Sequence, residues 1–256
     1  MSGAVPLFIT ASFILEEGLS IATLEKIVRS MAVTAKEANV AIVAGDTKVA
    51  EKGSVDQIFI STTGIGWIPG DRKINGQSAQ AGDMVILSGT MGDHGIAVLA
   101  QRGELGFSTT IESDVAPLGE LIQQLLQAAP NTHVLRDPTR GGVATTLNEI
   151  ALQSNVDIKL EEKNLPVKKQ VKAACEMLGF DPLYIANEGK LLAFVPANEV
   201  DAAMASLHNH PFGKEAIVIG QVHQKDGETP RVTMHTNIGG SRIIDTLAGE
   251  LLPRIC

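Results

Sequence analysis

Hydrophobic and polar positions follow two periods along the first part of the chain, one typical of strands and one typical of helices. Residues 7–14 form an apolar run that predicts a strand, and Glu16-Glu17-Gly18 predicts a turn after it. Ser20 suits the N-cap of a helix that we expect to continue to Ala38. The apolar residues at helical spacing are Leu24, Ile27, Val28, Met31 and Ala35. Residues 40–44 form a short unbroken apolar run, which predicts a buried strand.

The rest of the chain repeats a strand, a loop and a helix. Apolar runs predict strands at 58–62, 84–87, 156–160, 191–195, 216–222 and 232–235. Helical spacing predicts one helix that ends near Arg102, one that ends before Pro130, and others at 143–153, 168–178 and 199–208, with a loop at 103–115. The segment 191–222 then reads as a β-α-β unit. This alternation predicts a mixed chain of the α/β or α+β class.

A polar, glycine-containing stretch at 70–83 divides the chain, and we place a domain boundary there, ahead of Asp83. The expected domains are 1–81 and 82–246, followed by a tail at 247–256 that ends in Cys256. Chain ends are mobile unless they are tied down. A terminal thiol is therefore a nucleophile on a tether, although a cysteine at one position is more often an accident of sequence.

Composition excludes several classes of function. The net charge of −8 over 256 residues argues against nucleic-acid and anionic-membrane partners, which call for basic patches. No apolar run approaches the roughly 20 residues of a membrane span, and no secretory signal is present. Two cysteines make neither a disulfide framework nor a zinc site, so we expect free thiols in the cytoplasm. Cys175, at helical spacing with Val171 and Leu178, is expected in the core.

A first candidate site is the Gly45-Asp46-Thr47-Lys48 stretch, read as a loop after the strand at 40–44. An aspartate can hold Mg²⁺ through oxygen, and a lysine can neutralise phosphate charge, which together suit a nucleotide. The alternative is a surface turn with a solvated ion pair.

Two glycine-rich loops each open a predicted helix. Backbone N–H groups in Ser88–Gly95 could hold phosphate, although the Lys-Ser/Thr ending of a Walker A loop is absent. His94 is expected there as a polar residue of the helix N-terminus. In the loop at 137–142, Thr139 could cap the helix and Arg140 could bind an anion; ordinary capping and a salt bridge are the alternative.

Glu188 lies between Asn187 and Gly189, directly before a strongly apolar strand. A carboxylate at such a junction could act as a general base, with Lys190 as its charge partner, or it could be a solvated turn residue. The residues alone therefore indicate a nucleotide-binding enzyme without a standard P-loop, and leave Cys256 unexplained.

Six stretches together resemble the HypE family of hydrogenase maturation factors, in the PurM-like (AIR synthetase-related) ATP-binding superfamily. They lie in family order along the whole chain, and the Pro-Arg-Ile-Cys end is specific to this family. The stretches are Phe13-Ile14-Leu15-Glu16-Glu17-Gly18, Gly45-Asp46-Thr47-Lys48-Val49, Ser88-Gly89-Thr90-Met91-Gly92-Asp93-His94-Gly95, Arg136-Asp137-Pro138-Thr139-Arg140-Gly141-Gly142-Val143, Ala186-Asn187-Glu188-Gly189-Lys190 and Pro253-Arg254-Ile255-Cys256.

The resemblance implies a PurM-like two-domain architecture: a partial N-terminal ATP-binding domain, an α/β sandwich C-terminal domain and a flexible catalytic tail. It implies a chemistry as well. A HypF-type carbamoyltransferase places a carbamoyl group on Cys256, and ATP with Mg²⁺ then drives dehydration to an S-cyanate. The cyano group passes to iron on a HypC–HypD scaffold, as a ligand of nickel–iron hydrogenase.

The resemblance also gives roles to residues. Asp46 would bind the metal. Lys48 would stabilise charge on the transferring phosphoryl group or activate the thiocarbamate oxygen. Glu188 would take protons from the carbamoyl nitrogen, which Asn187 would orient. The expected contacts to the nucleotide are Asp46, Thr47, Gly89, Gly92, Asp93, Arg140 and Gly141.

Family members carry a further N-terminal segment, which contributes to the β-barrel of a homodimer and holds an acidic metal ligand. The chain starts abruptly in apolar sequence, and we interpret it as an N-terminally truncated form. Two alternatives stay open: another PurM-like ATP-dependent enzyme (a selenophosphate, thiamine-phosphate or aminoimidazole ribonucleotide synthetase type), which has no use for a terminal cysteine, and a non-catalytic docking module.

Overall fold

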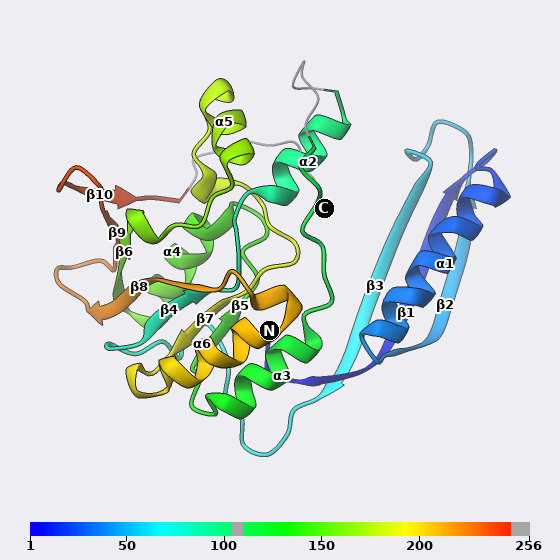
Figure 1. Cartoon of the computed structure of the whole chain (residues 1–256). Coiled ribbons are helices and arrows are strands. Elements are labelled where there is room, and N and C mark those ends of the chain that lie inside the picture. The colour runs from blue at the N-terminus through cyan, green and yellow to red at the C-terminus, as the bar shows by residue number, and fades with distance from the viewer. Residues whose placement is uncertain (104–109, 247–256) are drawn as a thin grey trace. The chain divides into compact units, whose positions relative to one another are not determined.

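The computed structural model describes residues 1–103 and 110–246, and these form two units (Figure 1). The small unit is Ala4–Arg72, and the large unit combines Met1–Gly3 with Lys73–Cys256. The division lies inside the polar stretch in which the sequence placed a boundary, but ahead of the expected position. Residues 73–81 pack with the large unit because Ile74 and Ala79 are buried in it. Ser154 Oγ fixes this segment by donating to Gly76 O and accepting from Ala79 N.

The large unit contains a seven-stranded sheet in the order β10-β9-β6-β8-β4-β7-β5. Neighbouring strands pair antiparallel except β6 and β9, which are parallel. The strands are β4 (Met84–Leu87), β5 (Val134–Arg136), β6 (Val156–Glu161), β7 (Leu192–Val195), β8 (Ile217–Gln224), β9 (Val232–His235) and β10 (Ser241–Ile244).

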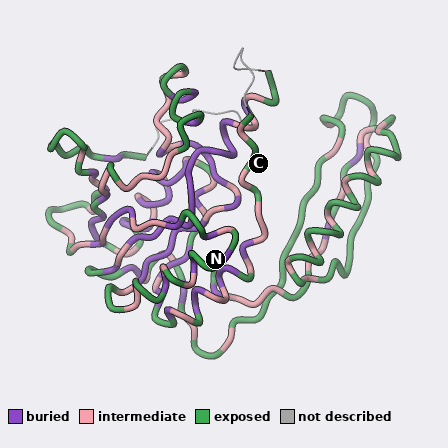
Figure 2. The backbone as a smooth tube through the Cα atoms, viewed as in Figure 1, coloured by how far each residue is buried: buried purple, intermediate pink, exposed green. Residues whose placement is uncertain are grey.

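Helices cover both faces of this sheet, because successive strand residues point to opposite sides. Val85 and Leu87 of β4 pack in one cluster with helix α4 (Gly142–Ser154). Ile86, between them, packs in a second cluster with α3 (Gly119–Ala128) and α6 (Val200–Asn209). Figure 2 shows the buried residues concentrated along the strands. The central strands β4 and β7 therefore read as unbroken apolar runs, and the sequence also located β6, β8 and β9, but it did not predict the short strands β5 and β10.

The remaining helices lie outside these two layers. Helix α2 (Asp93–Gln101) packs on α5 (Lys169–Leu178), and Cys175 is buried in that cluster, as the sequence predicted. Short 3-10 turns lie at Glu162–Asn164, Pro182–Tyr184, Ala197–Glu199 and Pro211–Gly213. The expected β-α-β unit of β7, α6 and β8 is a split one, because β4 lies between the two strands.

The small unit consists of a three-stranded sheet, β2-β1-β3, with helix α1 (Ile21–Glu37). Strand β1 (Val5–Glu16) is central, parallel to β2 (Ala41–Ala50) and antiparallel to β3 (Ile58–Trp67). Ser20 caps α1 as predicted, since its side chain accepts from Thr23 N. No helix among the described residues is both long and apolar enough to cross a membrane.

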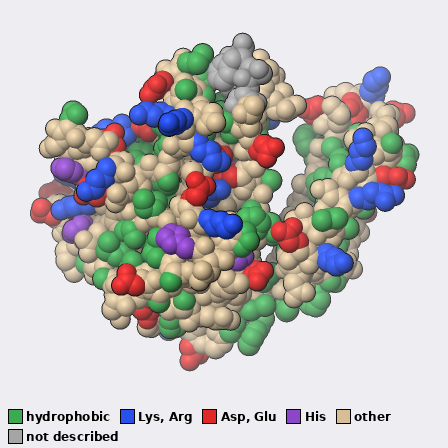
Figure 3. Space-filling view, in the orientation of Figure 1, with side chains coloured by type: hydrophobic (Ala, Val, Ile, Leu, Met, Phe, Trp, Pro, Cys, Tyr) green, Lys and Arg blue, Asp and Glu red, His purple; other side chains and the backbone are tan. Residues whose placement is uncertain are grey.

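Two expectations for the small unit are wrong. The apolar run at 40–44 is a strand, but Ala41–Ala44 are exposed rather than buried. The Gly45–Lys48 stretch is not a loop, because β2 continues through it and pairs with β1 as far as Ala50. Helix α1 has no buried residue, and many large apolar side chains of this unit are exposed (Figure 3). They include Phe8, Ile21, Val33, Val43, Val49, Phe59, Ile65 and Trp67.

Candidate active site

The loop at 186–190, directly before β7, is fastened to two other loops by Asn187. This residue is fully buried, and its Oδ1 accepts from Gly92 N at 2.7 Å. Its Nδ2 donates to Pro138 O and to Ile185 O, both at 3.0 Å. The amide has no donor left for a substrate, so the structure gives Asn187 a structural task in place of the expected orienting one. It joins the glycine-rich loop before α2 to the loop after β5.

Glu188 follows with its side chain half-buried and its Oε1 fully buried, without a hydrogen-bond partner among the described residues. Burial raises the pKa of this carboxyl group, and the charges of Asp114 and Asp137 raise it further, while His94 opposes the shift. A raised pKa makes a carboxylate a stronger base, which is what proton abstraction near neutral pH requires.

His94 stands beside Glu188 on the first turn of α2. It is buried, its Nδ1 lies 2.8 Å from Ser113 Oγ, and its Nε2 has no partner among the described residues. The same turn contacts the Glu188 loop again, because Gly95 N donates to Ala186 O at 3.1 Å. Hydrogen bonds therefore hold the start of α2 against the Glu188 loop.

Lys190 does not pair with Glu188, contrary to the sequence interpretation. Its Nζ lies 3.2 Å from Asp114 Oδ2, and both side chains are largely buried. Gly189 allows the two loops to approach, since a Cβ there would lie 1.6 Å from the backbone oxygen of Asp114. Lys190, which the sequence interpretation paired with Glu188, thus pairs with Asp114.

Asp93 opens α2 and is fully buried. Its Oδ2 accepts from Thr90 Oγ1 at 2.5 Å and forms an ion pair with Lys168 Nζ at 2.9 Å. The hydrogen bond to Asp93 raises the pKa of Lys168. Gly92 before it takes the left-handed conformation that glycine favours, with φ of 85°. Asp93 Oδ2 therefore supports the loop, while its Oδ1 is buried without a hydrogen-bond partner among the described residues. The nucleotide contact expected of Asp93 stays a prediction.

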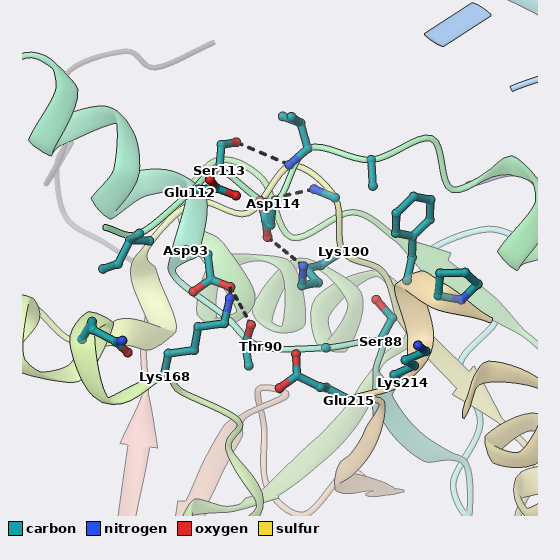
Figure 4. A pocket seen from close by; sticks show the side chains of 18 of the residues that line it. Ser88, Thr90, Asp93, Glu112, Ser113, Asp114, Lys168, Lys190, Lys214 and Glu215 are labelled. Carbon is teal, nitrogen blue, oxygen red and sulfur yellow. Dashed lines mark hydrogen bonds and ion pairs between the residues drawn. The ribbon is translucent and has the colours of Figure 1, made fainter. Parts of the chain in front are cut away.

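Both ion pairs border one cavity of about 500 Å³ (Figure 4). Lys168 and Asp93 form one part of its wall, and Lys190 and Asp114 form another. Ser88, Gly89, Thr90, Lys214 and Glu215 also line it. Gly89 leaves room for the Lys190 side chain, whose Cε would lie 3.0 Å from a Cβ at that position. The predicted phosphate loop is thus one wall of a cavity lined by both signs of charge.

The loop at 137–142 is built differently from the expectation. Helix α4 starts at Gly142 with Gly141 as its N-cap, in the left-handed conformation and without a side-chain cap. Thr139 does not cap it; its Oγ1 instead lies 3.4 Å from Asp137 Oδ2. Arg140 is exposed, beside Gly141 at the start of α4. Its anion-binding role stays a prediction.

In the small unit, Asp46, Thr47 and Lys48 are exposed residues of β2. Because strand side chains alternate, Asp46 and Lys48 point to one face of the sheet and Thr47 points to the other. Asp46 Oδ1 accepts the N–H of Thr47 at 2.8 Å. No cluster of three potential metal ligands occurs among the described residues, and the metal role of Asp46 stays a prediction.

The two cysteines fall in different situations. Cys256 and the rest of the predicted tail lie outside the described residues. Cys175 is buried, and burial raises the pKa of its thiol to about 11. A thiol held so far from ionisation is a poor nucleophile at neutral pH, so Cys175 does not compete with Cys256 as a reactive group.

Sequence reasoning missed Asp114 and Lys168. Asp114 lies in a stretch read only as loop, and its partners follow it by more than seventy positions. Lys168 looked like an ordinary first residue of a helix. Neither carries a local signal, because each owes its role to a contact made by folding.

Comparisons with known proteins identify the family. The family described as AIR synthase related protein matches with its N-terminal domain over residues 1–68 and its C-terminal domain over residues 80–233. The carbamoyl dehydratase HypE of Cupriavidus necator is 55% identical over 256 residues, which cover 100% of this chain and 72% of that protein.

Two solved structures agree. A HypE–HypF complex is matched with a TM-score of 0.92 and 51% identity, over 96% of this chain and 80% of the other. HypE in complex with ATP is matched with a TM-score of 0.94 and 47% identity, over 100% of this chain and 77% of the other. The chain belongs to the HypE family of carbamoyl dehydratases, within the AIR synthase related proteins.

Proposed function

We propose that this chain dehydrates an S-carbamoyl group on its own Cys256 to an S-cyanate at the expense of ATP. The product supplies the cyanide ligand of the iron in nickel–iron hydrogenase. The observation that carries the proposal is Glu188: a carboxyl group of raised pKa with a buried, unpaired Oε1, in a chain that aligns over its whole length with carbamoyl dehydratases.

The chemistry begins at the carbamoyl oxygen, which is a poor leaving group until it is phosphorylated. That oxygen attacks the γ-phosphorus, and the bond from phosphorus to the ADP oxygen breaks. The nitrogen then loses its two protons as the bond from carbon to the phosphorylated oxygen breaks. The products are thiocyanate on Cys256, ADP and phosphate, and the oxygen leaves with the phosphate. Glu188 is the residue suited to accept one of these protons, and the other leaves on the phosphate.

Asp46 and Lys48 are the proposed ligands of the nucleotide in the small unit. They share one face of β2, so a carboxylate for Mg²⁺ and an ammonium for phosphate are presented together. Bound Mg²⁺ would neutralise charge on the phosphates. Thr47 can contribute only its backbone from that face, since its side chain points to the other. A solved relative binds ATP.

The expected contacts in the large unit are proposed in a revised form. Gly89 and Gly92 would offer backbone to the nucleotide, with Asp93 and Asn187 as the residues that hold their loop in place. Arg140 and Gly141, at the exposed start of α4, would offer a cation and a helix N-terminus to an anion.

The proposal includes partners and location. A HypF-type carbamoyltransferase would load Cys256; a relative is known in complex with HypF. A HypC–HypD scaffold would receive the cyano group. A homodimer is supported by the exposed apolar side chains of the small unit, which a second copy could bury. All of these steps belong in the cytoplasm.

The test is intact mass spectrometry of the S-carbamoylated chain with Mg-ATP. Cyanate can load the tail selectively, because the thiol of Cys175 is buried and its pKa is raised to about 11. We expect the loss of one water at Cys256, and none in Cys256→Ala. ATP hydrolysis without any mass change at the tail would reject the function.

A further inference from the structure

Asp114 holds the backbone that carries Glu188. Its Oδ1 accepts the N–H of Glu188 at 3.1 Å and that of Gly189 at 3.4 Å. The Asp114 side chain is only 4% exposed. Hydrogen bonds of a buried carboxylate to backbone N–H groups are among the stronger ones in proteins. The direction of the Glu188 peptide is therefore fixed from the opposite loop.

The other oxygen of Asp114 forms an ion pair with Lys190 that does not have hydrogen-bond geometry. The Nζ–Oδ2 distance is 3.2 Å, and the lysine side chain is 13% exposed (Figure 4). Lys190 follows Glu188 by two positions, so it is the cation closest in sequence to that carboxylate. The ammonium group is held by Asp114, and Glu188 Oε1 has no partner among the described residues.

The structure assigns to Asp114 the role of positioning residue for Glu188: it fixes the Glu188 backbone and pairs with Lys190, so that Glu188 Oε1 stays without a partner and can accept a proton. This inference rests on the proposed function, in which Glu188 is the base. A carboxylate paired with an ammonium group would be a weaker base, because the positive charge favours its ionised form.

The charges around Glu188 fix the direction of the expected pH effect. Asp114 and Asp137 raise its pKa, together with burial, and His94 lowers it. Asp114→Asn keeps an oxygen for the two N–H groups but removes the charge and releases Lys190. Both changes lower the pKa of Glu188. The rate should therefore fall at neutral pH, and its acidic limb should move to lower pH.

The experiment measures single-turnover dehydration of the S-carbamoylated full-length chain against pH. We expect Asp114→Asn to slow the reaction by about tenfold, because a weaker base loses part of the roughly 10²–10⁴-fold that general-base catalysis contributes. Adding Lys190→Met should restore part of the rate, because the released cation is gone.

Asp157→Asn is the matched control. Asp157 is buried and likewise accepts two backbone N–H groups, from Asp226 at 2.9 Å and Arg231 at 2.8 Å, far from the Glu188 loop in sequence. It should keep the wild-type pH profile. An unshifted acidic limb in Asp114→Asn, or no recovery in the double variant, would overturn the inference.

Failure of the proposed function would look different. If the wild-type chain does not dehydrate its S-carbamoyl group, the proposed function is rejected. A ¹³C NMR titration of the Glu188 carboxyl group still tests the role of Asp114, because it needs no turnover. The pKa of Glu188 should be lower in Asp114→Asn than in wild type. Equal values would contradict the assignment to Asp114.

Discussion

The two units of the chain differ in how far their sheets are buried. In the large unit, helices cover both faces of the sheet, and Phe194 at its centre is 0% exposed. In the small unit, Phe59 is 53% exposed and α1 has no buried residue. Exposed apolar side chains on this scale mark a surface that is meant to be covered.

The difference extends to the candidate catalytic groups. Glu188 and the neighbours described for it, Asp114, Asp137 and His94, all belong to the large unit. Asp46 and Lys48 project from an exposed strand of the small unit. The first group is held in place by packing, whereas the second lies on an exposed strand.

The largest effect is expected from the preorganised group. Glu188→Gln keeps the shape of the side chain but removes its basicity, and dehydration should slow on the order of 10²–10⁴-fold. Binding of an ATP analogue, measured by calorimetry, should be unchanged. Glu149→Gln, which removes a half-exposed carboxylate paired with Arg136, is the control and should turn over normally. A normal rate in Glu188→Gln would show that Glu188 is not the base.

Paired truncations measure the contrast in packing. Phe194→Ala should reduce the free energy of unfolding by about 3–5 kcal/mol, the usual cost of emptying an aromatic site in a core. Phe59→Ala should change it by about 0.5 kcal/mol or less if its surface is exposed in solution. Chemical denaturation at several protein concentrations measures the free energy of unfolding of both variants. A large cost for Phe59→Ala that grows with concentration would show that a second copy covers the sheet.

The ion pair of Asp93 gives a smaller effect within the large unit. Lys168→Met removes the cation and leaves a fully buried carboxylate with Thr90 alone, which should cost about 1–3 kcal/mol. Lys214→Met, at another lysine of the same cavity, is the comparison and should be nearly neutral. Thermal unfolding of the two variants side by side tests this, and equal shifts would contradict the structural role of the pair.

The smallest expected effect is on the pH dependence of the free energy of unfolding. The pKa of Glu188 is raised in the folded chain, so the folded state holds the proton more tightly than the unfolded state. Its contribution to stability is therefore present at low pH and declines as pH rises from the ordinary carboxyl value towards the raised one. Glu188→Gln should consequently be slightly more stable than wild type at neutral pH, although it is inactive. A loss of stability there would show that the carboxylate is favourably paired.

The contrast also explains what the sequence could predict. Five strands of the large unit (β4, β6, β7, β8 and β9) were found from their apolar residues, whereas the short strands β5 and β10 were not predicted. Glu188 was found because it lies directly before such a strand. In the small unit, Gly45 and Asp46 were read as the end of a strand. The glycine is there for another reason: a Cβ on it would lie 2.5 Å from Ala11 O of the paired strand. Pairing with β1 overrode the local turn signal.

Burial and long-range contacts were beyond prediction for related reasons. The apolar run at 40–44 shows that these residues suit a covered surface, but not which chain covers them. Asp114 gave no signal, since its hydrogen bond to Glu188 spans 74 positions. The pairing of Lys190 was predicted wrongly because nearness in sequence favoured Glu188 and folding favoured Asp114.

The fate of the carbamoyl oxygen tests the central claim most directly. The chain is loaded at Cys256 with a carbamoyl group that carries ¹⁸O and is then given Mg-ATP for a single turnover. If the oxygen is phosphorylated before it leaves, the label appears in inorganic phosphate, in step with the formation of thiocyanate on the tail. Thiocyanate formed while the phosphate stays unlabelled would contradict the proposed mechanism.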